Sequence, residues 1–332
     1  MKLITILLII GLLSISSDIG SIVFRFQDST EFTKQALSQE KSFNQGLDLF
    51  NSEGDSICKT KGGKASDTGL KVWCWEDVSI PSYKGEKSVG FSDNQLKIDS
   101  ECSEEQVTIE KGKIKFNVNP VVPSSGEWCD NKFNMRAEIS TSPWLVNHPK
   151  GTEEWFGWSY TLGDDYIIDE DNPWLFFQVH EGTRGKTPLI ALWFMNKGGQ
   201  GSGNAGEIHV VNSSSNYGNH FYPSKIIPKA GQTLNIVLHV VWGDAYNGLL
   251  QVWIDGVLVH DRQGRTVRFS NPVGGNAKWG IYKWPWRSID GVTKSQKQGI
   301  THLQTFMGPL NIITRKPEDK DYLSNSYTLV SP

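Results

Sequence analysis

Short runs of alternating apolar and polar residues fill the chain from about residue 70 onward, separated by Gly, Pro, Asn and Asp. The segment 113–118 alternates strictly, as a strand with one buried face does. Similar runs predict further strands over 154–162, 174–180, 189–195, 207–211, 234–242, 249–254, 278–283 and 303–313. The pair Asp255-Gly256 between two apolar runs predicts a tight hairpin. No helical period of useful length interrupts these strands. The pattern therefore predicts an all-β fold, a β-jelly roll or sandwich of two antiparallel sheets.

The first residues have the layout of a secretory signal peptide. Lys2 precedes an apolar run over 3–13, and small serines follow it. The run is short for a membrane span, although an uncleaved N-terminal anchor is the alternative. We therefore expect a signal peptide over 1–17 and a secreted, extracellular protein. Residues 18–60 are polar and irregular and are interpreted as a lead-in segment, with the β-domain over 61–332.

Four cysteines follow the signal segment, at Cys58, Cys74, Cys102 and Cys129. An even number in an exported protein predicts two disulfides, for which three pairings are possible. No CxxC pair exists and no His stands at ligand spacing near them, which argues against zinc. Asn212-Ser213-Ser214 is a glycosylation sequon, usable in a eukaryotic secretory host.

The net charge and the aromatic content limit the classes of partner that the protein is expected to bind. The 332 residues carry a net charge of −3, so nothing in the overall charge favours nucleic acid. No later segment is long and apolar enough to cross a bilayer, and we expect no membrane partner. An anionic partner would have to meet a local basic patch. The 13 Trp residues suit stacking against sugar rings, although core packing accounts for most Trp in proteins.

Three short motifs place polar side chains two residues apart in predicted strands. They are Arg136-Ala137-Glu138, Gln178-Val179-His180 and Lys278-Trp279-Gly280-Ile281-Tyr282. Because side chains alternate faces along a strand, the polar members of each motif share one face. If the three faces line one concave sheet, these side chains converge.

This set of residues matches the needs of β-elimination at a uronic acid. The C5 proton is weakly acidic while the adjacent carboxylate is charged, so Arg136 and Gln178 are candidates to neutralise that carboxylate. Neutral His180 is a candidate base, and Tyr282 a candidate acid for the leaving oxygen. Lys278 shares the face of Tyr282 and could lower its pKa or hold a neighbouring uronate.

The three motifs, in this order, resemble those of concanavalin-like jelly-roll polysaccharide lyases. The jelly-roll alginate lyases of that group carry Arg-x-Glu, Gln-(Ile/Val)-His and Lys-x-Gly-x-Tyr. The surroundings, such as Trp155-Phe156-Gly157-Trp158, are most similar to the glucuronan lyase and heparin lyase I branch. The likeness spans roughly residues 70–315 of the mature chain. Ile139-Ser140 and Lys283-Trp284-Pro285 depart from the alginate lyase pattern, which reads Leu-Arg and Asn-Gln at these places.

The resemblance implies a lyase acting on an anionic polysaccharide, with glucuronan-like chains favoured and alginate or heparin-like chains next. It implies no cofactor for the elimination, and a structural calcium far from the cleft whose ligands the sequence does not identify. We expect a monomer. The substrate-binding candidates are two residues of the motifs, Lys278 and Glu138, and four residues that follow the motifs, Arg184, Lys186, Trp284 and Arg287. His209 and His220 are secondary candidates, whereas His239 in an apolar strand is interpreted as structural.

Two other functions fit the same fold. A glycoside hydrolase needs a pair of carboxylates across the scissile bond, and the Glu-x-Asp-x-(x)-Glu strand motif of jelly-roll glucanases is absent. Asp169-Glu170-Asp171 falls in a predicted turn before Pro173. A lectin would keep the sugar-stacking cleft without a base and an acid, so substitution of His180 or Tyr282 separates it from a lyase.

Overall fold

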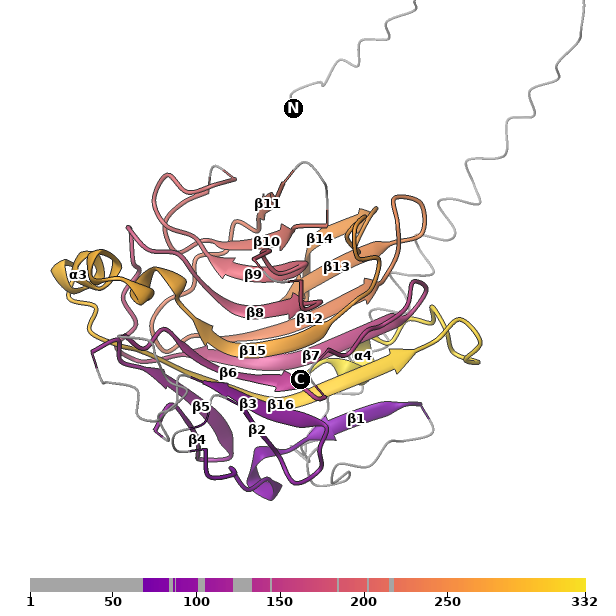
Figure 1. Cartoon of the computed structure of the whole chain (residues 1–332), viewed down its shortest axis with the longest axis horizontal. Helices are drawn as coiled ribbons and strands as arrows, with labels where there is room; N and C mark the ends of the chain where they lie inside the picture. Colours follow the sequence, from indigo (N-terminus) through magenta and orange to yellow (C-terminus); the bar gives the residue numbers. More distant parts are fainter. Residues whose placement is uncertain are drawn as a thin grey trace, which may run out of the picture. The chain divides into compact units, whose positions relative to one another are not determined.

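A computed structural model describes residues 68–83, 86, 88–100, 105–121, 133–143, 145–183, 185–201, 203–214 and 218–332. Within these residues the chain folds into two antiparallel sheets, each of eight strands (Figure 1). The prediction of an all-β sandwich is confirmed. The predicted signal peptide over 1–17 and lead-in segment over 18–60 lie outside the described residues.

Sheet A has the strand order β14, β13, β12, β7, β16, β5, β4, and β1 also pairs with β16. Its strands are β1 (Leu70–Trp73), β4 (Val107–Glu110), β5 (Lys113–Val118), β7 (Glu153–Leu162), β12 (Thr233–Val241), β13 (Leu249–Ile254), β14 (Val257–Gln263) and β16 (Leu303–Arg315). The hairpin predicted at Asp255-Gly256 joins β13 to β14, with Asp255 and Gly256 both at positive φ.

Sheet B has the order β11, β10, β9, β8, β15, β6, β3, β2. Its strands are β2 (Ser88–Gly90), β3 (Leu96–Ser100), β6 (Arg136–Thr141), β8 (Trp174–His180), β9 (Ile190–Phe194), β10 (Ile208–Asn212), β11 (His220–Pro223) and β15 (Asn276–Tyr282). Because β15 lies between β8 and β6, the three sequence motifs occupy adjacent strands.

Aromatic side chains fill the space between the two sheets. The ring centroids of Trp158 in β7 and Phe177 in β8 are 5.0 Å apart, and those of Phe156 and Trp279 are 5.7 Å apart. All four residues are fully buried. Since Phe177 and Trp279 turn inward, their polar neighbours in the motifs turn to the other face of sheet B.

A β-bulge in β8 changes which residues share a face with the motif. The pairing register with β9 shifts between Leu175 and Phe177. As a result Phe176 and Phe177 both lie in the core, and Leu175 joins Gln178 on the outer face. Strict alternation would have put Phe176 beside Gln178, so an extra residue in the strand supplies an apolar neighbour to the site.

Gly280 is required by the close approach of β15 to β6. Its φ is +136°, and a Cβ there would lie 2.2 Å from the Ala137 carbonyl oxygen and 2.8 Å from the Glu138 Cα. The Tyr160 hydroxyl donates to the Gly280 carbonyl at 2.8 Å. The Gly of the third motif is therefore explained by backbone contact.

We expect Gly280→Ala to lower the free energy of unfolding by about 3 kcal/mol, because both the φ angle and the contact with β6 oppose a side chain. Urea denaturation measures the loss. Gly69→Ala is the control, since Gly69 has a φ of +75° with nothing within 4 Å of a built Cβ. Equal losses in the two variants would show that the φ angle alone, and not the contact with β6, is responsible.

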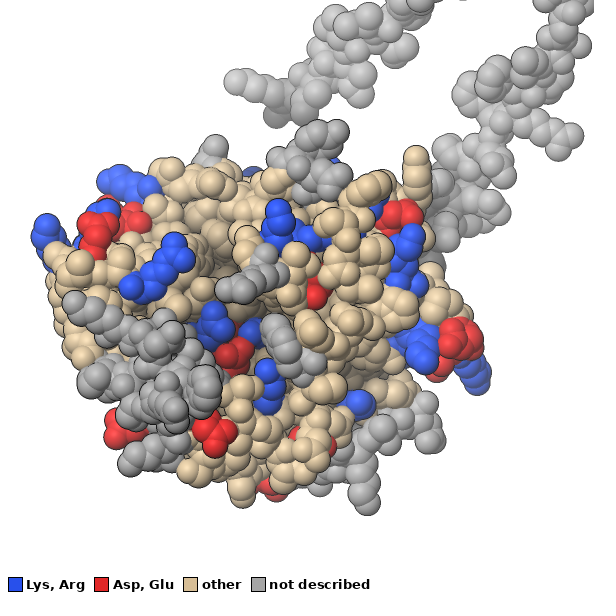
Figure 2. Space-filling model, viewed as in Figure 1, with Lys and Arg blue, Asp and Glu red and all other residues tan. Residues whose placement is uncertain are grey.

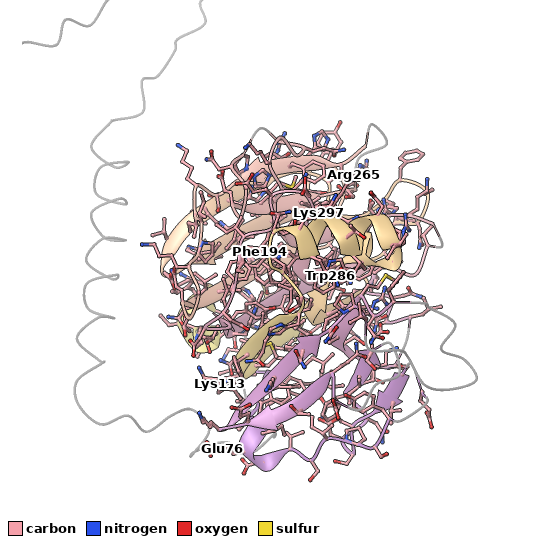
Figure 3. The ribbon with its side chains drawn as sticks, turned by 90° about the vertical axis from the view of Figure 1, so that its left-hand side faces the viewer. Glu76, Lys113, Phe194, Arg265, Trp286 and Lys297 are labelled. Atoms are coloured by element: carbon pink, nitrogen blue, oxygen red, sulfur yellow. The ribbon has the colours of Figure 1, made fainter. Side chains whose placement is uncertain are left out.

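Short helical segments correct the expectation that helices are absent from this part of the chain. The 3-10 helix η2 (Trp284–Arg287) leads into α3 (Ile289–Lys297), at one end of the sandwich (Figures 1 and 3). The Ser288 hydroxyl caps α3 by accepting from the Gly291 N–H, and Trp286 donates to the Ser295 hydroxyl at 2.8 Å. With only nine residues, α3 is too short to show a clear apolar period. The remaining helical segments are η1 (Trp75–Asp77) and α4 (Tyr327–Val330).

No helix of the described residues has the length and apolar character needed to span a membrane. Cys74 is buried after β1, while Cys58, Cys102 and Cys129 lie outside the described residues. The two disulfides therefore stay a prediction.

The side-chain amide of Asn212, the acceptor residue of the predicted sequon, makes internal hydrogen bonds. The Asn212 amide donates to the Arg265 carbonyl at 3.0 Å and accepts from the Ser214 N–H at 3.0 Å. Ser213 and Ser214 are buried. The folded chain thus does not present this amide for glycosylation.

Candidate active site

A hollow of about 620 Å³ lies on the outer face of sheet B and collects residues from all three motifs. This face is concave, with charged side chains of both signs inside it (Figure 2). The hollow, called the sheet B hollow below, is lined by Arg136, Leu175, Gln178, His180, Gly182, Thr183, Gly185, Lys186, Thr187, Pro188, Trp193, Lys278, Tyr282, Trp284 and Arg287.

The pairing register brings the predicted catalytic side chains together. Lys278 lies opposite Gln178, and Tyr282 lies opposite Arg136. The Arg136 guanidinium carbon stands 4.2 Å from the centroid of the Tyr282 ring, which is a cation–π contact. The expected convergence of Arg136, Gln178, His180 and Tyr282 on one concave face is thus what the structure has.

Asp99 in β3 is a site residue that the sequence analysis did not single out. It forms an ion pair with the Lys278 ammonium, and its Oδ1 lies 3.5 Å from an Arg136 guanidinium nitrogen. Burial alone would raise the pKa of Asp99, but Lys278 and Arg136 hold it well below the usual range. Asp99 therefore fixes both cations at the edge of the sheet B hollow.

Glu138 lies beneath the site and is fully buried. Its Oε1 accepts a hydrogen bond from the Gln178 amide nitrogen at 2.6 Å, and its Oε2 lies 3.5 Å from the Arg136 Nε. Glu138 was predicted to contact substrate, but its carboxylate is covered and does not line the sheet B hollow, so that contact stays a prediction. The carboxylate orients the amide of Gln178.

Glu138 also makes the free energy of unfolding depend on pH. Burial raises its pKa from 4.5 to about 7, against the opposing effect of Arg136 and Lys278. Between these values the folded protein keeps a proton that the unfolded chain releases, so this residue lowers stability as pH rises through the window. Glu138→Gln should remove that decline, by up to about 3 kcal/mol.

Urea denaturation of the wild type and Glu138→Gln at both ends of this pH window tests the expectation. Glu318→Gln, at an exposed position, controls for the loss of a carboxylate. A difference between wild type and Glu138→Gln that stays constant with pH would contradict a titration of Glu138 in this window.

The His180 ring is held by the loop that follows it. Its Nδ1 accepts from the Gly182 N–H at 2.8 Å, and its Nε2 lies 3.3 Å from the Lys186 carbonyl oxygen. Burial lowers the pKa of His180, more than the Glu181 carboxylate raises it. Burial therefore favours the neutral ring, and the Gly182 N–H donated to Nδ1 indicates that the ring proton is on Nε2, facing the Lys186 carbonyl.

Aromatic side chains form the other half of the sheet B hollow. Trp284 follows Tyr282 closely, and its ring centroid is 4.5 Å from that of Trp193 in β9. Trp193 was not predicted as a site residue, because one Trp in an apolar strand has no feature that separates it from core. A buried apolar layer of Leu175, Ala191 and Val211 supports these rings.

A buried ion pair anchors the segment that carries Trp284. Lys283 is fully buried, and its ammonium lies 2.8 Å from the Asp169 carboxylate. Burial lowers the pKa of Lys283 to about 8, against the attraction of Asp169. Asp169 also bonds the Ser295 hydroxyl in α3. The acidic stretch around Asp169 is therefore structural, as its predicted position in a turn suggested.

The other predicted residues lie in different places. Lys186 and Arg287 line the sheet B hollow as exposed cations, whereas Arg184 lies outside the described residues. His209 is buried against Gly203, and His220 is exposed on β11; neither lines the hollow. His239 bonds Glu153 and Gln251, each at 2.9 Å, in agreement with a structural role.

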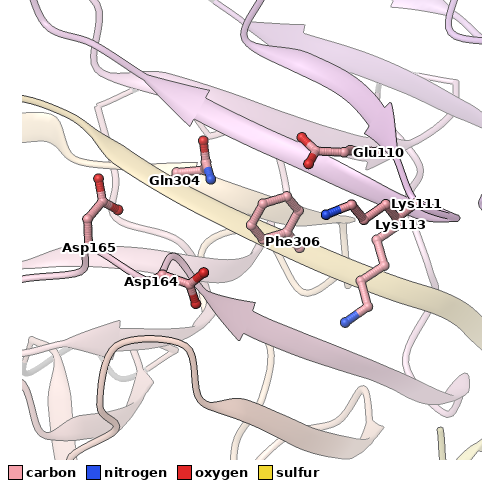
Figure 4. Close-up of a pocket in the computed structure, with 7 residues that line it drawn as sticks. All are labelled: Glu110, Lys111, Lys113, Asp164, Asp165, Gln304 and Phe306. Carbon is pink, nitrogen blue, oxygen red and sulfur yellow. The ribbon is translucent and has the colours of Figure 1, made fainter.

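A second hollow, of about 510 Å³, lies on sheet A, remote from the three motifs. It is lined by Glu110, Lys111, Lys113, Asp164, Asp165, Gln304 and Phe306 (Figure 4). Within the described part of the chain, no group of three or more His, Cys, Asp or Glu could hold a metal ion. The structural calcium stays an untested expectation.

Comparison with known proteins identifies a family. A family model described as polysaccharide lyase matches residues 75–305. No curated protein matches the chain. Among solved structures, the endo-β-1,4-glucuronan lyase of the fungus Trichoderma reesei is 16% identical, with a TM-score of 0.42 over 67% of this chain and 89% of that one.

Two alginate lyases are similar to the same degree. The enzyme from Pseudomonas aeruginosa is 15% identical, with a TM-score of 0.45 over 65% of this chain and 88% of its own. The alginate lyase Aly36B is 12% identical, with a TM-score of 0.47 over 76% of this chain and 99% of its own. Likenesses this distant say nothing of the substrate. The family model, however, covers more than half of the 332 residues, and the chain therefore belongs to the polysaccharide lyases.

Proposed function

We propose that this lyase cleaves a uronic-acid-containing polysaccharide by β-elimination and leaves a 4,5-unsaturated uronate at the new end. The observation that carries the proposal is the meeting of Arg136, Gln178, His180 and Tyr282 around one hollow. The substrate is an anionic chain, and these four residues supply the carboxylate ligands, the base and the acid that its elimination needs.

In the proposed reaction the uronate carboxylate lies against Arg136 and the second amide N–H of Gln178, the first being held by Glu138. Neutralising this carboxylate acidifies the C5 proton, which His180 accepts. The electron pair of the C5–H bond forms the C4–C5 double bond, and the C4–O4 bond breaks. The Tyr282 phenol protonates the departing oxygen.

His180 must free a nitrogen before it can act as the base. The Gly182 N–H occupies Nδ1, so the loop after His180 has to release this bond when substrate enters. Positive φ angles at Gly182 and Gly185 mark a loop built on glycine, which can adopt other conformations at low cost. The proposal therefore includes a shift of this loop on binding.

Glucuronan-like chains are the favoured substrate, followed by alginate or heparin-like chains. Support comes from the departures from the alginate lyase pattern at Ile139-Ser140 and Lys283-Trp284-Pro285. We further propose that the protein is exported through the segment 1–17, acts outside the cell as a monomer and requires no cofactor. Neither nucleic acid nor a membrane is a proposed partner.

A glycoside hydrolase is disfavoured by the composition of the site. The described residues that line the sheet B hollow include neither Asp nor Glu. Hydrolysis of a glycosidic bond requires two carboxylates facing the scissile bond. The nearest acids, Asp99 and Glu138, are engaged with cations and with Gln178.

The test is ultraviolet absorbance during incubation with glucuronan, alginate and heparin-like chains. Elimination creates a conjugated double bond and hydrolysis does not. Growing absorbance on one of these polymers supports the proposal. Chain shortening without absorbance would establish a hydrolase, and binding without shortening a lectin.

A further inference from the structure

We propose that Trp193 and Trp284 form a stacking subsite for the sugar ring next to the reacting uronate, and that this subsite selects gluco-configured pyranoses. The inference rests on the proposed function, because it takes the charged half of the sheet B hollow as the seat of the reacting uronate.

The sheet B hollow has two chemically different halves that meet at Tyr282. On one side, strands β15 and β6 carry Lys278 and Arg136, which Asp99 of β3 holds from outside the hollow. On the other side, β8, β9 and β10 contribute the apolar layer under Trp193. A uronate held by the cations of the first half would place the next ring of its chain over the second half.

The aromatic half has the features of a built binding surface. Trp193 and Trp284 are only half-buried, although both rest on fully buried apolar residues. Their rings are tilted by 52°, so they form a corner and not a flat stack. The ring of Trp284 is 6.0 Å from that of Tyr282, which puts the corner directly beside the proposed acid. The buried Lys283–Asp169 pair fixes the segment of Trp284.

The shape of the sugar decides how well it fits this corner. A β-linked glucuronate ring has all its substituents equatorial, so both of its faces present axial C–H groups that can lie on an indole. Mannuronate has one axial hydroxyl, and the guluronate chair has an axial hydroxyl as well as axial linkage oxygens. These axial groups separate the ring face from the indole and leave polar atoms against an apolar surface. The corner should therefore favour glucuronate over mannuronate, and guluronate least.

Calorimetric titration of inactive protein separates binding from turnover. Tyr282→Phe and Tyr282→Phe/Trp193→Ala are titrated with β-1,4-linked glucuronate and with guluronate oligosaccharides of equal length and charge. We expect Trp193→Ala to raise the Kd for the glucuronate oligosaccharide by on the order of tenfold, and that for guluronate by less than about twofold. Trp193→Phe, which keeps a ring, should restore most of the affinity.

Trp253→Ala in the same background is the matched control, because Trp253 is a half-buried Trp stacked on Trp155 in sheet A. Equal weakening for both oligosaccharides, or no weakening for either, would overturn the inference. Failure of the wild type to produce ultraviolet absorbance on any uronate polymer would instead overturn the proposed elimination. In that case the ratio of the two Kd changes still decides whether the corner selects glucuronate.

Discussion

Tyr282→Phe is expected to reduce elimination by on the order of 10³-fold to 10⁴-fold, the upper part of the range for loss of a general acid. The variant lacks the phenol that protonates the departing O4, yet it keeps the ring beneath the Arg136 guanidinium. Folding and substrate affinity should therefore change little. The measurement is the initial rate of ultraviolet absorbance on the best polymer.

Tyr222→Phe serves as the control, since Tyr222 has a half-buried phenol in β11 outside the sheet B hollow. It should retain wild-type rates. If Tyr282→Phe kept more than about a tenth of the activity, the acid would have to be another group, because a general acid accounts for at least about 10²-fold.

Arg136→Ala is expected to reduce kcat by on the order of 10²-fold to 10³-fold, as removal of one group that stabilises a developing anion does. Two effects add. The carboxylate of the reacting uronate loses its guanidinium partner, and Asp99 loses one of its nearby cations while keeping the ion pair with Lys278. Arg136→Lys should recover part of the rate, because it restores the charge but not the planar pair of donors.

Steady-state kinetics of Arg136→Ala and Arg262→Ala provide the comparison. Arg262 also stacks on a tyrosine, with its guanidinium carbon 5.3 Å from the Tyr222 ring centroid, but it is exposed on β14. Its loss should leave kcat unchanged. A rise in KM alone for Arg136→Ala would mean that Arg136 binds the ground state and the transition state equally.

The sequence predicted the strands of the central sheets and the shared face of each motif, because both follow directly from a period of two. β8 and β13 have the predicted bounds. One hollow is lined by the motif residues Arg136, Gln178, His180, Lys278 and Tyr282. These features need no knowledge of which strands are neighbours.

What the sequence did not predict depends on neighbours in space. Asp99 lies in a short strand that was not expected, and only its pairing with β6 brings it to Arg136. Glu138 and Arg136 are two residues apart in β6 and point to the same face, yet the Glu138 carboxylate is fully buried. Residues 174–177 are all apolar, so the sequence pattern does not reveal the bulge at Leu175–Phe177. The pairing of Trp193 with Leu175 therefore could not be predicted from the sequence.

Sheet A cannot be completed until β16 has been synthesised, because β16 lies inside the sheet. β16 is the last strand in sequence among the described residues, yet it lies between β7 and β5 and also pairs with β1. The indole of Trp75 donates to the Gly308 carbonyl across 233 residues of sequence. Until β16 emerges, the edges of β7 and β5 that it will pair stay open, and such edges are prone to aggregate. A nascent chain therefore keeps these strand edges unpaired until residues 303–315 have been synthesised.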